Sequence, residues 1–222
     1  MQNYTNYRII YINDCSSDET KSKVENFSEL FYKKNIKFHL INNIKKIGSL
    51  ASKYNYINEF INDDEIVVVL DGDDSLIGNY VFNYLNYIYS KHNIWVTYGS
   101  YLNTSGKISF QKKYPKNVIS SNNFRQYFHP SHLRTYYAFL FKKINKMYFT
   151  DNAGAFFKTG EDKATMYPLL ELAGNRHKFI NFFLYLYNDT NPIGLYSNEG
   201  INQLKEFNST QIKKMKSVRP LD

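Results

Sequence analysis

The chain has 222 residues and a formal net charge of +8, from 28 Lys and Arg against 20 Asp and Glu. This length suits one domain, with or without a tail, and allows a substantial core. The sequence contains no apolar run long enough for a transmembrane helix, and its first residues lack the apolar region of a signal peptide. The single cysteine, Cys15, excludes a disulfide framework within the chain and favours a reducing compartment, so we expect a cytoplasmic protein.

The basic residues are scattered along the chain in short lysine pairs. No long basic block and no recognisable nucleic-acid module is present, so we expect no nucleic-acid partner. We interpret the positive charge mainly as solvated surface, with a contribution to attracting a phosphorylated substrate.

The N-terminal half alternates between strand and helix patterns. Strands are predicted at residues 7–13, 36–41, 66–70 and 94–101, and helices at residues 21–34, 49–62 and 79–91. This alternation predicts an α/β fold with a mainly parallel sheet, flanked by helices and joined by right-handed crossovers. Near the C-terminus, residues 202–216 are compatible with a short helix lying on the domain or with an interaction segment.

The predicted strand at residues 66–70 ends in three acids, Asp71, Asp73 and Asp74, placed around Gly72. Its β-branched run is typical of a strand buried on both faces, and ligands bind at the carboxyl ends of such strands. Crowded carboxylates repel one another, and a hard cation such as Mg²⁺ or Mn²⁺ removes that repulsion while bringing phosphate oxygens with it. The alternative is a polar turn bent at Gly72, with solvated acids.

A second polar turn follows the first predicted strand, at residues 14–20. We expect Asp14 to contact a ligand, because a carboxylate there can accept the N3–H of a uracil or a ribose hydroxyl. For Asp18 and Thr20 we favour capping of the next helix. Neither G-x-G-x-x-G nor G-x-x-x-x-G-K-[ST] occurs, so any bound phosphates must be held by a metal and side chains.

Together these two turns resemble those of the family 2 glycosyltransferases, which have the GT-A fold. That family typically shows a D-D-x-S-x-D-x-T turn and a later D-x-D, which correspond to NDCSSDET at residues 13–20 and LDGDD at residues 70–74. The departure is Asn13 at the first acidic position. Further similar segments follow in order: GSLASK at 48–53, GEDK at 160–163 and YLYN at 185–188. We therefore take residues 1–192 as a GT-A, Rossmann-like domain and residues 193–222 as a C-terminal tail or short helix.

The resemblance implies a metal-dependent, inverting transfer of a sugar from a nucleotide donor to an acceptor hydroxyl, and we expect the nucleotide to be UDP. In this reading Asp162 is the general base and Glu161 its neighbour. The remaining implied contacts are Asp71, Asp73 and Asp74 to Mn²⁺ or Mg²⁺, and Asp14, Lys53, Asp71 and Arg134 to the donor. The structural alternatives are a helix N-terminus for Glu161 and Asp162, a solvated Lys53 and an ion-paired Arg134.

One departure from the family concerns the start of the fold, where a strand and a helix normally precede the first polar turn. We expect both to be missing here, which would leave an apolar sheet edge exposed. This favours the main alternative function, a degenerate glycosyltransferase-like module that binds without turnover. A nucleotidyltransferase is a further alternative, but its usual glycine-rich loop is absent.

The sequence is compatible with a glycan, a lipid carrier or a protein side chain as the acceptor. It is also compatible with a homodimer. Trp95 and Tyr98 suit either stacking on a sugar or packing in the core. The histidines His92, His129 and His177 lack the spacing of a zinc site.

Overall fold

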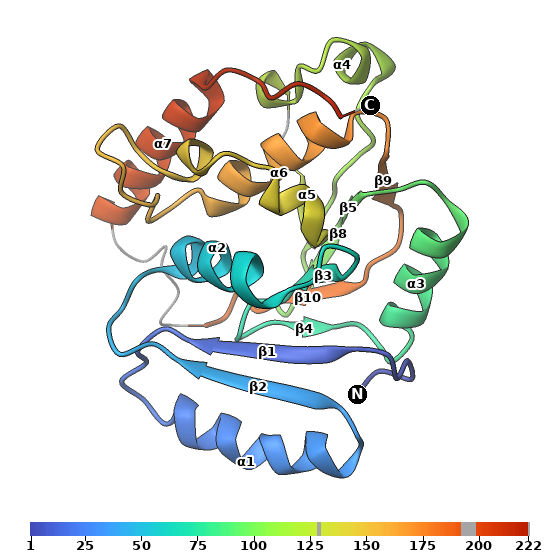
Figure 1. Ribbon diagram of the computed structural model, residues 1–222, viewed down its shortest axis with the longest axis vertical. Helices are drawn as coiled ribbons and strands as arrows, with labels where there is room; N and C mark the ends of the chain where they lie inside the picture. Colours follow the sequence, from blue (N-terminus) through green and yellow to red (C-terminus); the bar gives the residue numbers. More distant parts are fainter. Residues whose placement is uncertain (128–129, 192–198, 222) are drawn as a thin grey trace.

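The computed structural model describes residues 1–127, 130–191 and 199–221, which form an α/β fold (Figure 1). The strands are β1 (Arg8–Asn13), β2 (Lys37–Asn42), β3 (Ile66–Val69), β4 (Ser75–Leu76), β5 (Val96–Gly99), β6 (Tyr101–Asn103), β7 (Ile108–Ser109), β8 (Ser131–Tyr137), β9 (His177–Ile180) and β10 (Tyr185–Tyr187). The α-helices are α1 (Thr20–Lys33), α2 (Ser49–Phe60), α3 (Val81–Lys91), α4 (Lys116–Ser120), α5 (Ala138–Lys142), α6 (Glu161–Ala173) and α7 (Glu199–Lys214). The predicted elements of the N-terminal half are thus present, and their boundaries differ by a few residues.

The described strands form three sheets, in the orders β1-β2, β4-β10-β6-β7 and β3-β8-β5-β9. In the last of these, β8 runs antiparallel to both of its neighbours, so β3 and β5 point the same way. β9 is parallel to β5. The α/β alternation is confirmed, but β8 separates two predicted parallel strands and makes the sheet mixed. Strand direction depends on long-range pairing, and nothing local in the β8 sequence indicates it.

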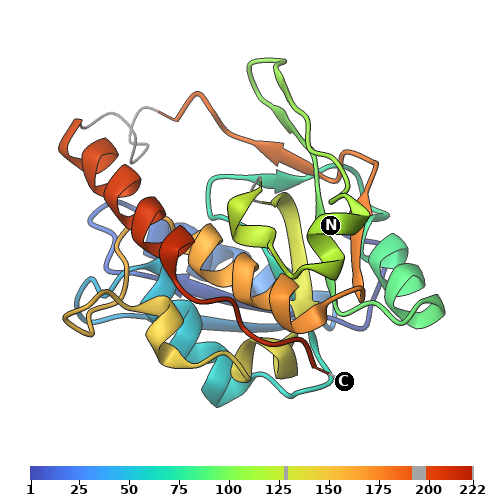
Figure 2. The same cartoon turned by 90° about the horizontal axis from the view of Figure 1, so that it is seen from above.

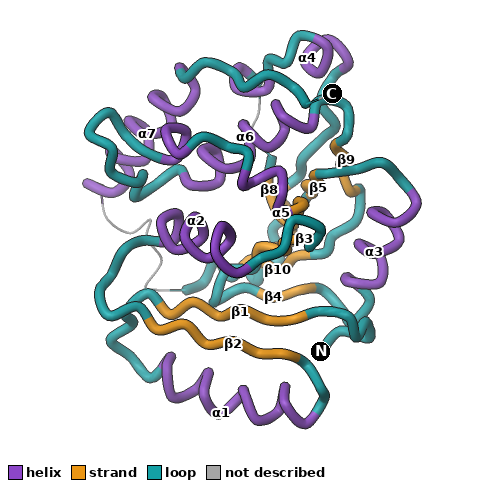
Figure 3. Tube along the Cα trace, viewed as in Figure 1, coloured by secondary structure: helices purple, strands orange, loops and turns teal. Residues whose placement is uncertain are grey.

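Helices cover both faces of the β3-β8-β5-β9 sheet. On one face, the main core joins side chains of α5 and α6 to Tyr98 of β5 and Tyr136 of β8. On the other face, Val81 and Leu85 of α3 pack with Leu133 of β8 in a second cluster. Figure 3 shows these strands lying between the helices. This layering exposes the ends of the strands, and the acidic turn lies at one of those ends.

β1 and β3 lie near one another without pairing. β1 pairs with β2 alone among the described strands, and β3 pairs with β8 alone. Arg8 at the start of β1 donates to both carboxylate oxygens of Glu65, just before β3, at 2.9 and 2.5 Å. The expected unpaired edge is therefore present. The predicted burial of residues 66–70 on both faces is wrong: β3 is half-buried, because it is an edge strand, and Leu70 is 46% exposed.

The C-terminal segment packs on α6, as Figure 2 shows from above. Ile212 of α7 is fully buried in the main core. Beyond α7, the backbone N–H of Val218 donates to Glu171 at 3.0 Å, and that of Leu221 donates to the carbonyl of Leu172 at 2.9 Å. Of the two alternatives for residues 202–216, the structure has the helix, which ends at Lys214 and lies on the domain. Residues 192–198, at the start of the predicted tail, lie outside the described residues.

A buried ion pair joins Glu171 of α6 to Arg125, and Arg125 also contacts α7. Arg125 donates from Nε and Nη2 to the Glu171 carboxylate at 2.6 and 2.8 Å, and from Nη1 to the carbonyl of Ile212 at 2.8 Å. The two side chains are 2% and 0% exposed. Removing one partner of such a pair leaves the other charge buried and uncompensated, which costs far more than the intact pair contributes.

We predict that Arg125→Ala lowers the free energy of unfolding by about 3–5 kcal/mol and the thermal midpoint by roughly 10 °C. Chemical and thermal unfolding measure the change. The matched control is Glu25→Ala, which breaks the exposed Lys21–Glu25 pair, 3.9 Å long, and should cost less than about 0.5 kcal/mol. Equal effects of the two substitutions would contradict a stabilising role for the buried pair.

Candidate functional site

The acidic turn directly follows β3. It is closed by a hydrogen bond from the N–H of Asp74 to the carbonyl of Asp71 at 3.1 Å. Gly72 allows a close approach here, because a Cβ at this position would lie 3.3 Å from the hydroxyl of Tyr11 on β1. The carboxyl ends of β1 and β3 therefore meet beside the turn. The two polar turns thus follow strands whose carboxyl ends lie at one edge of the fold.

Asp74 anchors the turn to β10. Its carboxylate accepts from the hydroxyl of Tyr185 at 2.5 Å and from the N–H of Asn188 at 2.7 Å. Burial raises the pKa of Asp74, and the nearby Asp73 and Asp71 add to that rise, while the two hydrogen bonds counter it. Both Asp74 oxygens are thus used within the protein. Asp74 was predicted as a metal ligand, and the geometry favours a structural role for it.

The residues that fit a divalent cation are Asp71 and Asp73. Asp71 is 36% exposed at its side chain, and Asp73 accepts one hydrogen bond, from Asn191 at 2.7 Å. Within the described parts of the chain, no three His, Cys, Asp or Glu side chains are grouped as a metal site. Two carboxylates still fit Mg²⁺ or Mn²⁺, since these ions are commonly held by one or two carboxylates together with substrate phosphates.

Arg134 on β8 lies between the acidic turn and α6. Its side chain is 6% exposed, with Nη1 3.4 Å from Asp162 and Nη2 3.9 Å from Asp71. Burial alone would lower the pKa of Arg134, but the two carboxylates outweigh it and raise that pKa, so the guanidinium stays charged. Arg134 therefore lies against both Asp71, the expected metal and donor ligand, and Asp162, the expected general base.

The ring of His132 helps to position Arg134. Its ring nitrogens lie 3.1 and 3.2 Å from Nη2 of Arg134, and the ring stacks on Tyr185 with centroids 4.1 Å apart. Tyr185 in turn holds Asp74. One continuous set of contacts thus connects β8, β10 and the acidic turn.

Glu161 and Asp162 occupy the first turn of α6, after Gly160, whose φ of +76° is in the left-handed region that favours glycine. Glu161 is ion-paired with Nζ of Lys53 on α2 at 2.9 Å. Asp162 is 37% exposed at its side chain. Glu161 and Asp162 therefore lie at a helix N-terminus, where acidic side chains interact favourably with the helix dipole. Lys53, predicted as a donor contact, instead ties α2 to α6.

Asp14 is committed to the loop between β2 and α2. One carboxylate oxygen accepts from Nδ2 of Asn43 at 2.8 Å and from the N–H of Ile47 at 3.0 Å, and the other accepts from the N–H of Gly48 at 2.8 Å. Burial would raise the pKa of Asp14, but these hydrogen bonds outweigh it and hold the pKa below its usual value. The predicted ligand carboxylate is here a loop anchor.

This pKa shift predicts a pH-dependent effect of Asp14→Asn. A carboxylate whose pKa is lowered by folding stabilises the protein above its unfolded pKa of about 3.9, and loses that effect as pH falls through the folded value. At pH 7 the substitution should cost about 1–2 kcal/mol, because an amide has one acceptor oxygen. We expect the difference from wild type to shrink toward about pH 3 in thermal unfolding. A difference of constant size across that range would contradict the assignment, and the exposed Glu59→Gln serves as control.

The two aromatic residues considered for sugar stacking differ in burial. Tyr98 is fully buried in the core, whereas Trp95 is half-buried near the amino end of β5. The N–H of Thr20 donates to Asp18 at 3.0 Å, whereas the N-cap residue of α1 is Glu19, which makes no side-chain capping bond. His129 lies outside the described residues. None of the described helices is long and apolar enough to cross a membrane.

The partners that complete the site were not predicted individually. Tyr185 and Asn188 were noted only as part of a resembling segment, and Asn43 and Asn191 were not noted at all. Each contacts an acid distant in the sequence, and no local pattern marks such a pair. In an Asn-rich chain, no single asparagine is distinctive.

The fold and this site define an α/β protein of the GT-A glycosyltransferase type. Residues 1–157 match glycosyl transferase family 2, and the chain belongs to that family. A search of curated proteins finds no significant match.

Two solved structures illustrate the fold. The first is the mannosyltransferase PcManGT from Pyrobaculum calidifontis in complex with GDP-Man and Mn²⁺, with a TM-score of 0.56 and 14% identity over 86% of this chain. The second is GalNAc-T7 with UDP, GalNAc and Mn²⁺, with a TM-score of 0.52 and 14% identity over 90% of this chain. The aligned parts span 51% and 41% of those two chains, so this chain corresponds to about half of each or less.

Proposed function

We propose that the chain is a glycosyltransferase that moves a sugar from a nucleotide donor, UDP-linked, to an acceptor hydroxyl with inversion. The observation that carries this proposal is the placement of Asp71 and Asp162 on one buried guanidinium, that of Arg134. The acidic turn and the candidate base thereby belong to one site. Family membership supports the proposal, as do the nucleotide ligands and Mn²⁺ named for the two similar structures.

At the donor side, Asp71 and Asp73 would hold Mn²⁺ or Mg²⁺. Such an ion, when bound, stabilises the charge that builds on the leaving diphosphate as a Lewis acid. Asp74 keeps the turn in place through Tyr185 and the Asn188 backbone. We assign the same kind of positioning role to Asp14, which holds residues 43–48 near the site, in place of the predicted contact to a nucleobase.

At the acceptor side, Asp162 removes the proton from the acceptor hydroxyl as that oxygen attacks the sugar. Arg134 orients the Asp162 carboxylate, and Lys53 holds the neighbouring Glu161. A single displacement with one base inverts the configuration at the anomeric carbon. The acceptor is a glycan, a lipid carrier or a protein side chain.

The experiment incubates the protein with Mn²⁺ and UDP-glucose, UDP-galactose, UDP-N-acetylglucosamine or GDP-mannose, with water as the acceptor, and measures the nucleotide released as the sugar is hydrolysed. We expect release from a UDP-sugar at a rate above that of Asp162→Asn. GDP release alone would overturn the UDP assignment and keep the enzyme class.

A non-catalytic binding module is the second candidate, favoured by the unpaired edges of β1 and β3. A binding module would bind the nucleotide sugars but release no nucleotide from any of the four donors. Binding of the donors is followed separately, by equilibrium dialysis, so that a lack of turnover and a lack of binding are distinguished.

A further inference from the structure

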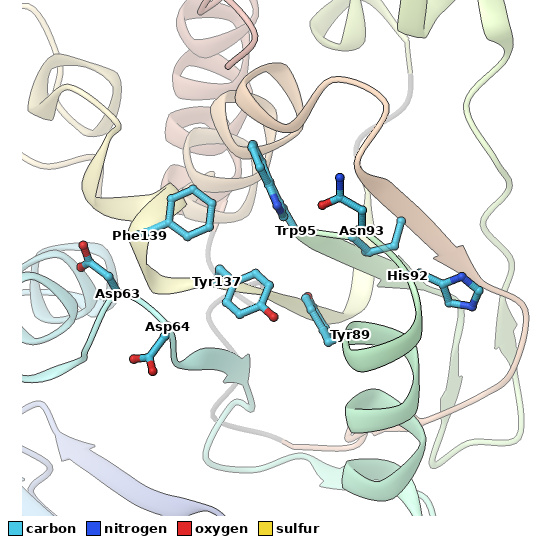
Figure 4. Close-up of a pocket in the computed structure, with 9 residues that line it drawn as sticks. Asp63, Asp64, Tyr89, His92, Asn93, Trp95, Tyr137 and Phe139 are labelled. Atoms are coloured by element: carbon cyan, nitrogen blue, oxygen red, sulfur yellow. The ribbon is translucent and has the colours of Figure 1, made fainter. Parts of the chain in front are cut away.

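A cavity lies at the end of the sheet opposite the acidic turn. Asp63 and Asp64 on its rim precede β3, whereas Asp71 follows that strand. The cavity has a volume of about 450 Å³, within the usual range for small-molecule sites. Figure 4 shows the side chains that surround it. None of them belongs to the site described above, so the cavity is a separate feature of the molecule.

Aromatic rings form the walls of this cavity and brace one another. Phe139 meets Trp95 edge-on, with centroids 5.1 Å apart and an interplanar angle of 86°. Tyr137 meets Tyr89 in the same way, at 5.2 Å and 86°. The hydroxyl of Tyr89 is fixed by a hydrogen bond to Thr135, 2.8 Å long. The walls are therefore apolar and pre-organised, which lowers the entropy lost when a ligand binds.

The rim of the cavity is polar and exposed. Asp64 and Asn93 are exposed there, on opposite sides in the view of Figure 4, with His92 near Asn93. Asp64 forms no hydrogen bond or ion pair with any other described residue. A carboxylate offers acceptors alone, and an amide offers both donors and acceptors. Apolar ring faces beside such groups suit a sugar, which has apolar C–H faces and hydroxyls that both donate and accept.

An organic cation is the other ligand class that aromatic rings and carboxylates can bind. Here one carboxylate of the rim and the face of one ring are already occupied by the protein's own cations. Lys142 pairs with Asp63 at 2.8 Å, and the guanidinium of Arg176 lies over the Trp95 ring at 4.2 Å. The net charge of +8 also disfavours a further cation. These observations favour a neutral ligand.

We propose that this cavity is a second carbohydrate-binding site, which takes a neutral sugar residue against its aromatic walls, with Asp64 and Asn93 bonding to the hydroxyls. It lies at the far end of β3 from the acidic turn, and so binds glycan apart from the transfer site. It needs neither nucleotide nor metal.

The test uses Trp95, the single tryptophan of the chain, as a reporter inside the cavity. Its fluorescence is titrated with cellotetraose, maltotetraose and chitotetraose, without nucleotide or metal. We expect a saturable change with at least one of these neutral oligosaccharides. Asp64→Ala and Asn93→Ala should each weaken that binding about tenfold, because each removes a hydrogen-bonding group from the rim. Both residues are exposed, so the fold should survive, and Glu59→Gln outside the cavity should bind like wild type.

Three results would overturn the proposal: no fluorescence change with any of the three sugars, a change that the two rim variants leave intact, or saturable binding of tetramethylammonium in place of the sugars. The outcome is separate from that of the transfer reaction. Asp162→Asn should keep the fluorescence response while losing transfer, and Asp64→Ala should keep nucleotide release.

Discussion

Asp162→Asn is expected to abolish most glycosyl transfer while leaving donor binding unchanged. Asparagine has nearly the same shape and keeps one oxygen for Arg134, which lies 3.4 Å from the carboxylate. It cannot accept the proton of the acceptor hydroxyl. Loss of a general base typically lowers a rate by about 10²–10⁴-fold. The measurement compares the transfer rate at saturating donor with the donor affinity from calorimetry.

The matched control for this substitution is Glu161→Gln, at the adjacent position of α6. Glu161 is engaged by Lys53, so its loss should weaken the positioning of α6 with a smaller effect, under about tenfold. Full transfer activity in Asp162→Asn would show that the base assignment is wrong. Equal losses in the two variants would assign both residues a structural role.

Asp73→Asn is expected to remove the metal dependence of nucleotide binding. Asp74 is held by Tyr185 and by the Asn188 backbone, so Asp71 and Asp73 are the carboxylates left for an ion. With one of them replaced, the gain in affinity from Mn²⁺ should fall by at least about 100-fold, more than the loss of an outer partner of a ligand usually costs. Titration of UDP at several Mn²⁺ concentrations measures this gain.

Asp74→Asn provides the comparison for this second prediction. It should lower thermal stability, because the amide cannot accept both of the hydrogen bonds that Asp74 accepts, while much of the Mn²⁺ effect remains. The reverse pattern, with metal dependence lost in Asp74→Asn and kept in Asp73→Asn, would contradict the assignment of the ligands.

The elements of the N-terminal half could be predicted because hydrophobic periodicity is a local property. The stripe in residues 49–62 and the Val-rich run before Asp71 each indicate one element without reference to the rest of the chain. The position of β8 between β3 and β5 could not be predicted, since it depends on pairing between segments far apart in the sequence. For the same reason the partial exposure of the β3 side chains was missed.

In the candidate site too, local residue types indicate some features, whereas other roles depend on partners far apart in the sequence. The residue types around Gly72 and at the start of α6 indicate acidic chemistry on their own. The roles of Asp14 and Lys53 depend on their partners, residues 43–48 and Glu161, and only the folded chain brings these together. The importance of Arg134 likewise rests on two carboxylates from different elements. Residue type therefore predicted which segments meet in the candidate site, and long-range contacts decide which of its groups are already held by the protein.

The proposed function requires the acidic turn to bind a nucleoside diphosphate together with a metal. Calorimetric titration of UDP and GDP into the protein, each with and without Mn²⁺, measures this binding. We expect UDP binding that requires Mn²⁺ and is tighter than GDP binding. The absence of nucleotide binding under all four conditions would contradict the proposed function.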